Sequence, residues 1–249
     1  MNIDSHCHFD QLNFHEREKE ISENIVIAVA TGYKSGEKLL EYAELYPNLK
    51  VCLGLHPEYF ENYNEYDLIE KQIRKNLDKI SGIGEIGLPH FNLEGMEEAK
   101  KQNLIEDSKV IFNKFLLLAK ELNLGVNLHC IEDSAEYAIQ RLKEYSIKKA
   151  LFHWFEGSDR DLEEIIRTNW KISISPDVLY NEKYRKFVSK VPLNVICLES
   201  DGPWEYNNKR GLPSMISETA ELLAKIYNIS KEEILEISNE NSNYLFSVL

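Results

Sequence analysis

Six residues, all histidines or acids, stand at similar places along the chain although they are far apart in sequence. Each follows a short apolar run of β-strand length. They are His6, His8, Glu85, His129, His153 and Asp201. Histidine nitrogens and carboxylate oxygens are the ligands that zinc, manganese and magnesium take in proteins. If the apolar runs are parallel strands of one barrel, all six side chains reach the end where barrel enzymes build their active sites.

His6 and His8 form the strongest local signal. Residues two apart on a strand point to the same side, so both imidazoles can reach one metal ion. The alternative is two ordinary polar residues near the N-terminus.

Glu85 lies between glycines in the run Gly-Ile-Gly-Glu-Ile-Gly at 82–87. Glycine lets another group approach the backbone closely, and a carboxylate can bridge two metals with its two oxygens. The alternative for Glu85 is a solvated acid at a strand exit.

His129 and His153 each end an apolar run. A lone histidine in such a place is commonly a hydrogen-bonded core residue, but two at equivalent strand ends favour metal ligands. Asp201 ends the last run and could bind a metal, accept a proton from a water, or both. Glu199, two residues earlier, could hold a ligating imidazole in one tautomer. His56 follows the third run, where we expect it to contact a substrate phosphate or a water; the alternative is a loop histidine.

Aromatic side chains also gather after the expected strand ends. They are Tyr59, Phe60, Trp154, Phe155 and Trp204. Aromatic rings in such positions can stack on nucleobases, and the alternative for each is a place in the core. His15 lies in a charged helical stretch and is expected at the surface, and nothing in the sequence requires a role for His90.

Apolar runs of strand length recur along the whole chain and alternate with helical patterns. The runs lie near 2–6, 25–30, 50–55, 80–86, 125–129, 149–153, 171–175 and 194–199. Ser158 with Asp161, and Ser230 with Glu233, predict capping boxes at the starts of two helices. Strand–helix alternation of this kind implies a parallel sheet. Eight such units predict one α/β domain over 1–249, closed into a (β/α)8 TIM-type barrel. The rival is an open doubly wound sheet, which normally carries a glycine-rich phosphate loop that is not seen here.

Composition limits the classes of function. The formal net charge is -13, which argues against broad nonspecific nucleic-acid binding because phosphate contacts need Lys and Arg. A narrow cleft is still compatible with nucleic acid, since bound divalent cations reverse the local sign of an acidic site. The four cysteines show no CxxC spacing and predict reduced core thiols of a cytoplasmic protein. The longest charge-free run, near 25–33, is too short to span a bilayer, so no membrane association is expected.

Taken together, the motifs resemble the TatD family of metal-dependent deoxyribonucleases, within the amidohydrolase-like barrels. The resemblance covers nearly the whole chain, and the ordered set is specific although each motif alone is weak. The matching segments are Asp4-Ser5-His6-Cys7-His8-Phe9-Asp10, Gly54-Leu55-His56-Pro57, Gly84-Glu85-Ile86-Gly87-Leu88, Asn127-Leu128-His129-Cys130, His153-Trp154-Phe155-Glu156-Gly157, Glu199-Ser200-Asp201-Gly202-Pro203 and Asn241-Ser242-Asn243-Tyr244-Leu245-Phe246.

The resemblance implies two divalent metal ions (Mg, Mn or Zn) and phosphodiester hydrolysis, usually on DNA ends or single-stranded DNA. One ion would be held by His6, His8 and Asp201 and the other by His129 and His153, with Glu85 bridging. Asp201 would be the general base, with Glu85 the other catalytic residue.

The sequence departs from the family pattern at three places. Ile131 stands where the family usually has an Arg, Pro89 where it usually has an Asp, and Trp204-Glu205 where an aromatic–aliphatic pair usually follows the proline. A missing Arg removes a natural phosphate clamp, which Lys209 and Arg210 could replace. We expect substrate contacts from His56, Trp154, Trp204, Lys209 and Arg210.

Two other classes of function stay open at this point. The first is a hydrolase with the same metals that acts on an amide, an ester or a small phosphodiester, because fold alone does not choose the bond that is broken. Acidic charge and Ile131 favour this alternative. The second is a binding or assembly subunit whose metal site is not catalytic, and the complete set of six ligands argues against it. The sequence indicates no particular protein partner.

Overall fold

The computed structural model of this protein describes residues 1–131, 134–155 and 157–248. Within them, eight parallel strands follow one another around a barrel in the order of the chain, which confirms the predicted (β/α)8 fold. Of the residues in the matching motifs, Glu156 lies outside the described part. The barrel strands are β1 (Asn2–Cys7), β2 (Asn24–Val29), β3 (Leu49–Leu53), β4 (Ile80–Gly87), β5 (Gly125–His129), β6 (Ala150–Phe152), β7 (Lys171–Ile174) and β8 (Ile196–Leu198).

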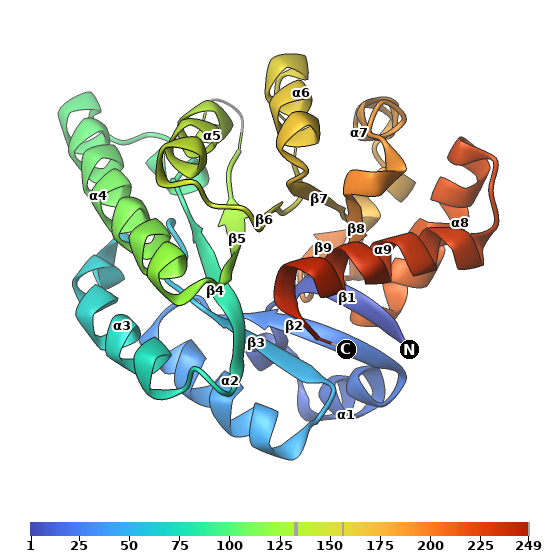
Figure 1. The fold of residues 1–249 in the computed structure, drawn as a ribbon, viewed down its shortest axis with the longest axis horizontal. Coiled ribbons are helices and arrows are strands. Elements are labelled where there is room, and N and C mark those ends of the chain that lie inside the picture. The colour runs from blue at the N-terminus through green and yellow to red at the C-terminus, as the bar shows by residue number, and fades with distance from the viewer. Residues whose placement is uncertain (132–133, 156, 249) are drawn as a thin grey trace.

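Helices connect consecutive strands and surround the barrel (Figure 1). The α-helices are α1 (Phe14–Glu23), α2 (Tyr33–Leu45), α3 (Tyr66–Lys75), α4 (Glu98–Leu122), α5 (Ser134–Tyr145), α6 (Asp159–Thr168), α7 (Glu182–Val188), α8 (Ile216–Tyr227) and α9 (Lys231–Phe246). The 3-10 helices are η1 (Phe9–Gln11), η2 (Phe60–Glu65), η3 (Phe91–Leu93), η4 (Pro176–Leu179), η5 (Leu193–Val195) and η6 (Pro213–Met215). A short hairpin of β9 (Glu205–Tyr206) and β10 (Lys209–Arg210) follows β8.

Local sequence signals place most element boundaries correctly. Both predicted capping boxes form, at Ser158 of α6 and at Ser230 of α9. The last predicted strand begins two residues too early, because the segment after Pro192 first turns through the 3-10 helix η5. His15 is exposed as expected.

The strand residues divide into two apolar layers by their alternation. On β2, Val26 and Ala28 pack outward with the helices, whereas Ile25, Ile27 and Val29 fill the barrel interior. This division follows from the period of two along a strand. The barrel interior is therefore apolar at the end where the strands begin.

Helix α9 closes that end of the barrel. It lies against β1 and β8, where Figure 1 draws it in red. Its residues Leu245 and Phe246 belong to the interior cluster. Ser238 accepts the backbone N–H of Leu198 at 2.8 Å, and Asn239 accepts that of Ile3 at 2.8 Å. The predicted metal ligands lie at the opposite end of the barrel, where the strands finish.

All four cysteines are buried and free of disulfides. Among the described helices, none is both long and apolar enough to cross a membrane.

We predict that Phe246→Ala destabilises the protein by about 3–5 kcal/mol, because a fully buried ring in the barrel end leaves a cavity. Chemical denaturation followed by circular dichroism measures the free energy of unfolding. Leu45→Ala is the matched control, since Leu45 is 69% exposed, and it should change stability by less than about 0.5 kcal/mol. Equal stability of both variants would contradict the sealing role of α9.

Candidate metal centre

The structure brings the other five predicted residues, together with His56, around the side chain of Glu85. This carboxylate is fully buried at the end of β4. Its Oε1 lies 2.8 Å from His129 Nδ1 and 2.9 Å from His153 Nε2. Its Oε2 faces three other imidazoles, which come from the ends of β1 and β3. Their Nε2 atoms, in His6, His8 and His56, each lie 3.5 Å from it. The two oxygens of one carboxylate thus divide the histidines into two groups.

Asp201 completes the group on the Oε2 side. Its Oδ1 lies 3.5 Å from the Nε2 atoms of both His6 and His8. His6, His8 and Asp201 could therefore hold one cation, and His6, Glu85 and His153 form a further set of converging ligand atoms. The ring of His6 stacks on that of His153 with centroids 4.0 Å apart, so the two groups are in direct contact.

The hydrogen bonds of Nδ1 in His6 and His56 decide which nitrogen of each ring carries the proton. They show which imidazole can bind a metal ion through Nε2 and which can donate a hydrogen bond from it. His6 Nδ1 lies 2.8 Å from Asn127 Oδ1, whose amide nitrogen in turn donates to the Ser5 carbonyl. Nδ1 of His6 is therefore protonated, and Nε2 offers a lone pair to a cation. In His56 the order is reversed, because Nδ1 accepts the backbone N–H of Glu58 at 3.3 Å. Its Nε2 then carries the proton, which suits a hydrogen bond to an oxygen of a water or substrate.

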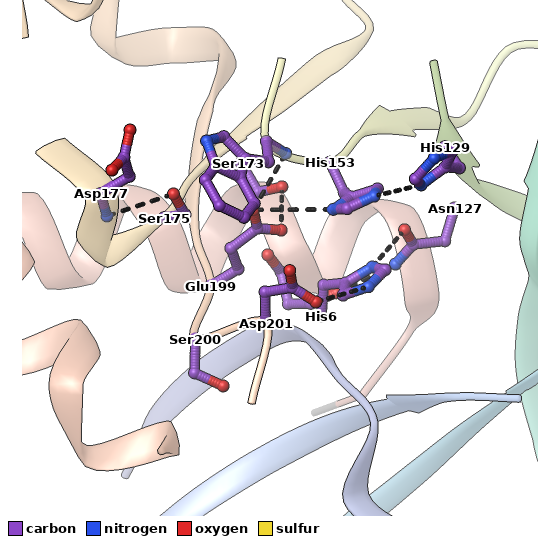
Figure 2. Close-up of polar contacts among 12 residues, drawn as sticks. His6, Asn127, His129, His153, Ser173, Ser175, Asp177, Glu199, Ser200 and Asp201 are labelled. Carbon is purple, nitrogen blue, oxygen red and sulfur yellow. Dashed lines mark hydrogen bonds and ion pairs between the residues drawn. The ribbon is translucent and has the colours of Figure 1, made fainter. Parts of the chain in front are cut away.

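Glu199 lies beside His153, on the side away from His129 (Figure 2). Its Oε1 is 3.8 Å from His153 Nδ1 and accepts the backbone N–H of Trp154 at 2.9 Å. Ser173 donates to its other oxygen. Two hydrogen bonds thus hold the Glu199 carboxylate, which faces the nitrogen of His153 that points away from Glu85. This arrangement fits the predicted role of holding an imidazole in one tautomer.

Two residues that sequence reasoning missed also contact the centre. Asn127 is fully buried and fixes His6, and its signal was its position two residues before His129 on one strand face. Glu58 Oε1 lies 3.7 Å from His129 Nε2. Glu58 also accepts backbone N–H groups from residues 90–92, far along the chain, so no sequence spacing could have shown its place.

The charges of the centre follow from this geometry. Burial would raise the pKa of Glu85, but the surrounding imidazoles, His153 and His6 among them, hold it well below its usual value. Burial opposes ionisation of Asp201 too, and His6 lowers its pKa. Burial lowers the pKa of His56 to about 3, so this imidazole is neutral. The centre therefore holds two ionised carboxylates beside nitrogen donors.

A divalent cation fits this donor set. His6 Nε2 and Glu85 Oε2 are buried, and neither has a hydrogen-bond partner among the described residues. Burial lowers the pKa of His153, but Glu85 and Glu199 outweigh this effect and raise it well above its usual value. A site that attracts a proton so strongly also attracts a cation, and the two compete because a ligating imidazole is neutral.

Two glycines allow Glu85 to lie at the centre. A Cβ atom at Gly84 would stand 2.6 Å from Asn127 Cβ, and one at Gly54 would stand 2.7 Å from the Glu85 carbonyl oxygen. Both distances are shorter than real contacts, so β3 and β5 can approach β4 this closely only because these positions have no side chain.

The predicted substrate residues outside the metal centre differ in their exposure and in the partners that they already contact. Trp204 is 56% exposed, and its ring meets that of half-buried Trp154 with centroids 5.9 Å apart. Lys209 is exposed and lies over the ring of Tyr180. Arg210 forms an ion pair with Glu16 at 2.9 Å, so binding a phosphate through Arg210 would require this pair to open.

Phe155, another of the candidate aromatics, is fully buried and packs on Phe152 and Phe187. It belongs to the core and is not accessible for stacking on a base.

Known proteins resemble this chain over nearly its whole length. The family model described as TatD related DNase matches residues 3–247. The human protein named Deoxyribonuclease TATDN3 is 32% identical over 268 residues, which cover 99% of this chain and 95% of the human one. A Haemophilus influenzae protein named an uncharacterized metal-dependent hydrolase is 29% identical over 236 residues, or 92% of each chain. The crystal structure of YJJV, a TatD homolog from Escherichia coli, matches with a TM-score of 0.86 at 25% identity and covers 100% of this chain and 98% of its own.

We predict that Asn127→Ala weakens metal binding about 10- to 100-fold, because losing a partner of a ligating histidine typically has this effect. Competition with a chromophoric chelator measures the affinity for Zn²⁺ or Mn²⁺ directly. Asn103→Ala, at an exposed position of α4, is the control and should bind as the wild type does. Wild-type affinity in the Asn127 variant would contradict its placing of His6.

Glu85→Ala should lose most of the metal, because its carboxylate faces both groups of histidines.

Proposed function

This chain belongs to the TatD-related family of metal-dependent hydrolases, and from that membership we propose that it is a deoxyribonuclease. The proposed substrate is a DNA end or single-stranded DNA, from which it removes nucleotides as an exonuclease by hydrolysis of a phosphodiester bond. The name of the human relative supports this choice of substrate. The four free, buried cysteines support a reducing, cytosolic compartment.

The observation that carries the proposal is the division of histidines between the two oxygens of Glu85. We propose that His6, His8 and Asp201 hold one divalent ion and that His129 and His153 hold a second, with Glu85 shared between them. The Oε1 and Oε2 contacts separate the histidines along this same line. Donors made only of nitrogen and oxygen favour Mg, Mn or Zn.

Such ions, when bound, supply Lewis acidity and lower the pKa of a water. The protein's own groups carry out the remaining tasks. Asp201 is the proposed general base: its pKa lies below the usual value, so it is ionised, and it keeps 7% exposure where Glu85 has none. His56 donates from Nε2 to a phosphoryl oxygen, which stabilises the charge that develops there. Glu58 and Glu199 place a carboxylate 3.7 Å and 3.8 Å from the outer nitrogens of His129 and His153, where each favours a protonated nitrogen on that side of the ring.

A second candidate is hydrolysis of an ester, amide or small phosphodiester that is not nucleic acid. The net charge of -13 and the apolar Ile131 favour it, because both leave few cations for a DNA backbone. Arg210, a proposed replacement for the missing cation, is already paired with Glu16. This candidate uses the same metal centre, so only the choice of substrate separates the two.

We expect activity to disappear in excess chelator and to return with Mg²⁺, Mn²⁺ or Zn²⁺. The experiment compares single-stranded DNA with a chromogenic small phosphodiester and a carboxylic ester, using one metal-reconstituted preparation. Preference for DNA supports the nuclease, whereas turnover of the small substrates alone supports the second candidate. Full turnover by protein whose metal content is confirmed as nil would exclude a metal mechanism.

Asp201→Asn tests the proposed base. The amide keeps the shape and one oxygen donor but loses charge and basicity. The remaining histidines of the centre and Glu85 should still retain at least one metal ion, while the rate falls by about 10²- to 10⁴-fold, the usual contribution of a positioned base. Metal content and turnover must be measured on the same sample. If the variant keeps its metal and the wild-type rate, the proton is taken by another group.

A further inference from the structure

Two large aromatic rings are exposed on opposite sides of the metal centre. Phe91 is 58% exposed and follows β4, whereas Trp204 is 56% exposed and follows β8. Because the eight strands run around the barrel in order, β4 and β8 are half a turn apart. Phe91 has its ring centroid 6.3 Å from that of His129, and Trp204 lies three residues after Asp201. Phe91 therefore borders the centre beside His129, and Trp204 borders it beside Asp201.

Glu58 holds the backbone on either side of Phe91. The carboxylate of Glu58 accepts the N–H groups of His90 at 2.5 Å, Phe91 at 2.9 Å and Asn92 at 2.8 Å. The side chain of Asn92 donates back to the Glu58 carbonyl at 3.1 Å. A loop held by four hydrogen bonds, three of them to a carboxylate, presents its exposed ring at a fixed place.

The opposite ring is held in a comparable way. The N–H of Trp204 donates to the Asp201 carbonyl at 2.9 Å, and its carbonyl accepts the N–H of Gly211 at 2.6 Å. Trp154 packs against its ring with an angle of 74° between the planes. Trp204 is thus connected through its own backbone to a proposed metal ligand.

An exposed aromatic ring on a fixed backbone has a specific use at a nucleic-acid site. Bases stack on such rings regardless of sequence, because every base has a π-face. This kind of contact needs no cation, which matters in a chain with a charge of -13. A single exposed ring is ordinary on any protein surface, but here two rings border one centre, and hydrogen bonds hold the backbone of both.

We propose that Phe91 and Trp204 are two stacking platforms, and that the substrate is a nucleic-acid strand that crosses the mouth with a base on each side of the bond to be cut. This inference rests on the proposed nuclease function and deepens it. A base on one platform belongs to the nucleotide that is released, and the base on the other belongs to the nucleotide that remains. Recognition then depends on two adjacent bases rather than on a basic surface.

The test combines protein variants with DNA in which one base is missing. Single-stranded oligonucleotides carry an abasic residue either directly 5′ or directly 3′ of the scissile phosphate. On intact DNA, Phe91→Ala and Trp204→Ala should each lower kcat/KM about tenfold or more. Each variant should lose little further on one abasic substrate, because the ring and its base are then both absent, and the two variants should be insensitive to opposite sides.

Matched variants separate stacking from general damage. Phe91→Trp should retain the wild-type rate, whereas Phe91→Leu, which keeps apolar bulk without a flat face, should behave like Phe91→Ala. Leu45→Ala, exposed at the end of α2, is the surface control and should change nothing. Binding of a labelled oligonucleotide in the Asp201→Asn background gives a second readout, in which Phe91→Ala should raise Kd about tenfold.

The outcomes distinguish a failure of the two stacking platforms from a failure of the proposed nuclease function. If the metal-loaded wild type cuts no DNA, the proposed nuclease and the two platforms fall together. If it cuts DNA while Phe91→Ala keeps full kcat/KM and Kd, only the platform at Phe91 is excluded. Insensitivity of both variants to the same abasic side would also overturn the proposal, because it places both rings on one base.

Discussion

A carboxylate buried away from water needs compensating charge or hydrogen bonds, because an unpaired buried ion is unfavourable by several kcal/mol. Glu85 is fully buried, and histidines from the ends of four other strands, β1, β3, β5 and β6, surround it. No hydroxyl or amide side chain bonds its Oε2 among the described residues. The polar end of the barrel is therefore organised to keep this one charge in place, and a site that does so with imidazole nitrogens is also a site for cations.

Much of this arrangement could be predicted from sequence, because its signals are local. Apolar runs gave the strands, and the position of each histidine or acid at the end of a run gave its place at the mouth. The parallel barrel then brings distant residues together without any further information. The two-residue spacing of His6 and His8 even predicts that both face one atom, and both Nε2 atoms lie 3.5 Å from Glu85 Oε2.

The residues that sequence could not place act through contacts between distant loops. Glu58 contributes because its carboxylate binds three N–H groups of residues 90–92, which no pattern around Glu58 reveals. His56 is assigned as a donor because the backbone N–H of Glu58 bonds its Nδ1 and leaves the proton on Nε2, and this contact is seen only in the three-dimensional structure. For Phe155 the sequence left base stacking and a core position open, and its full burial supports the core position. Side-chain direction after a strand end is set by the turn, and the turn is not encoded in periodicity.

Closure of the barrel is what assembles the first group of ligands. His6 and His8 come from the first strand and Asp201 from the last, so these residues meet only when β1 and β8 come together. Buried Asp4 holds that seam: its carboxylate accepts the N–H of Ser200 at 2.9 Å and the hydroxyl of Ser200 at 2.5 Å. The N–H of Asp201 then donates to the carbonyl of His6 at 3.0 Å, and the N–H of His8 to that of Gly202 at 2.7 Å. The hydrogen bonds that complete the fold thus lie within two residues of the proposed ligands. Closure of the barrel between β1 and β8 consequently brings His6, His8 and Asp201 to the same point.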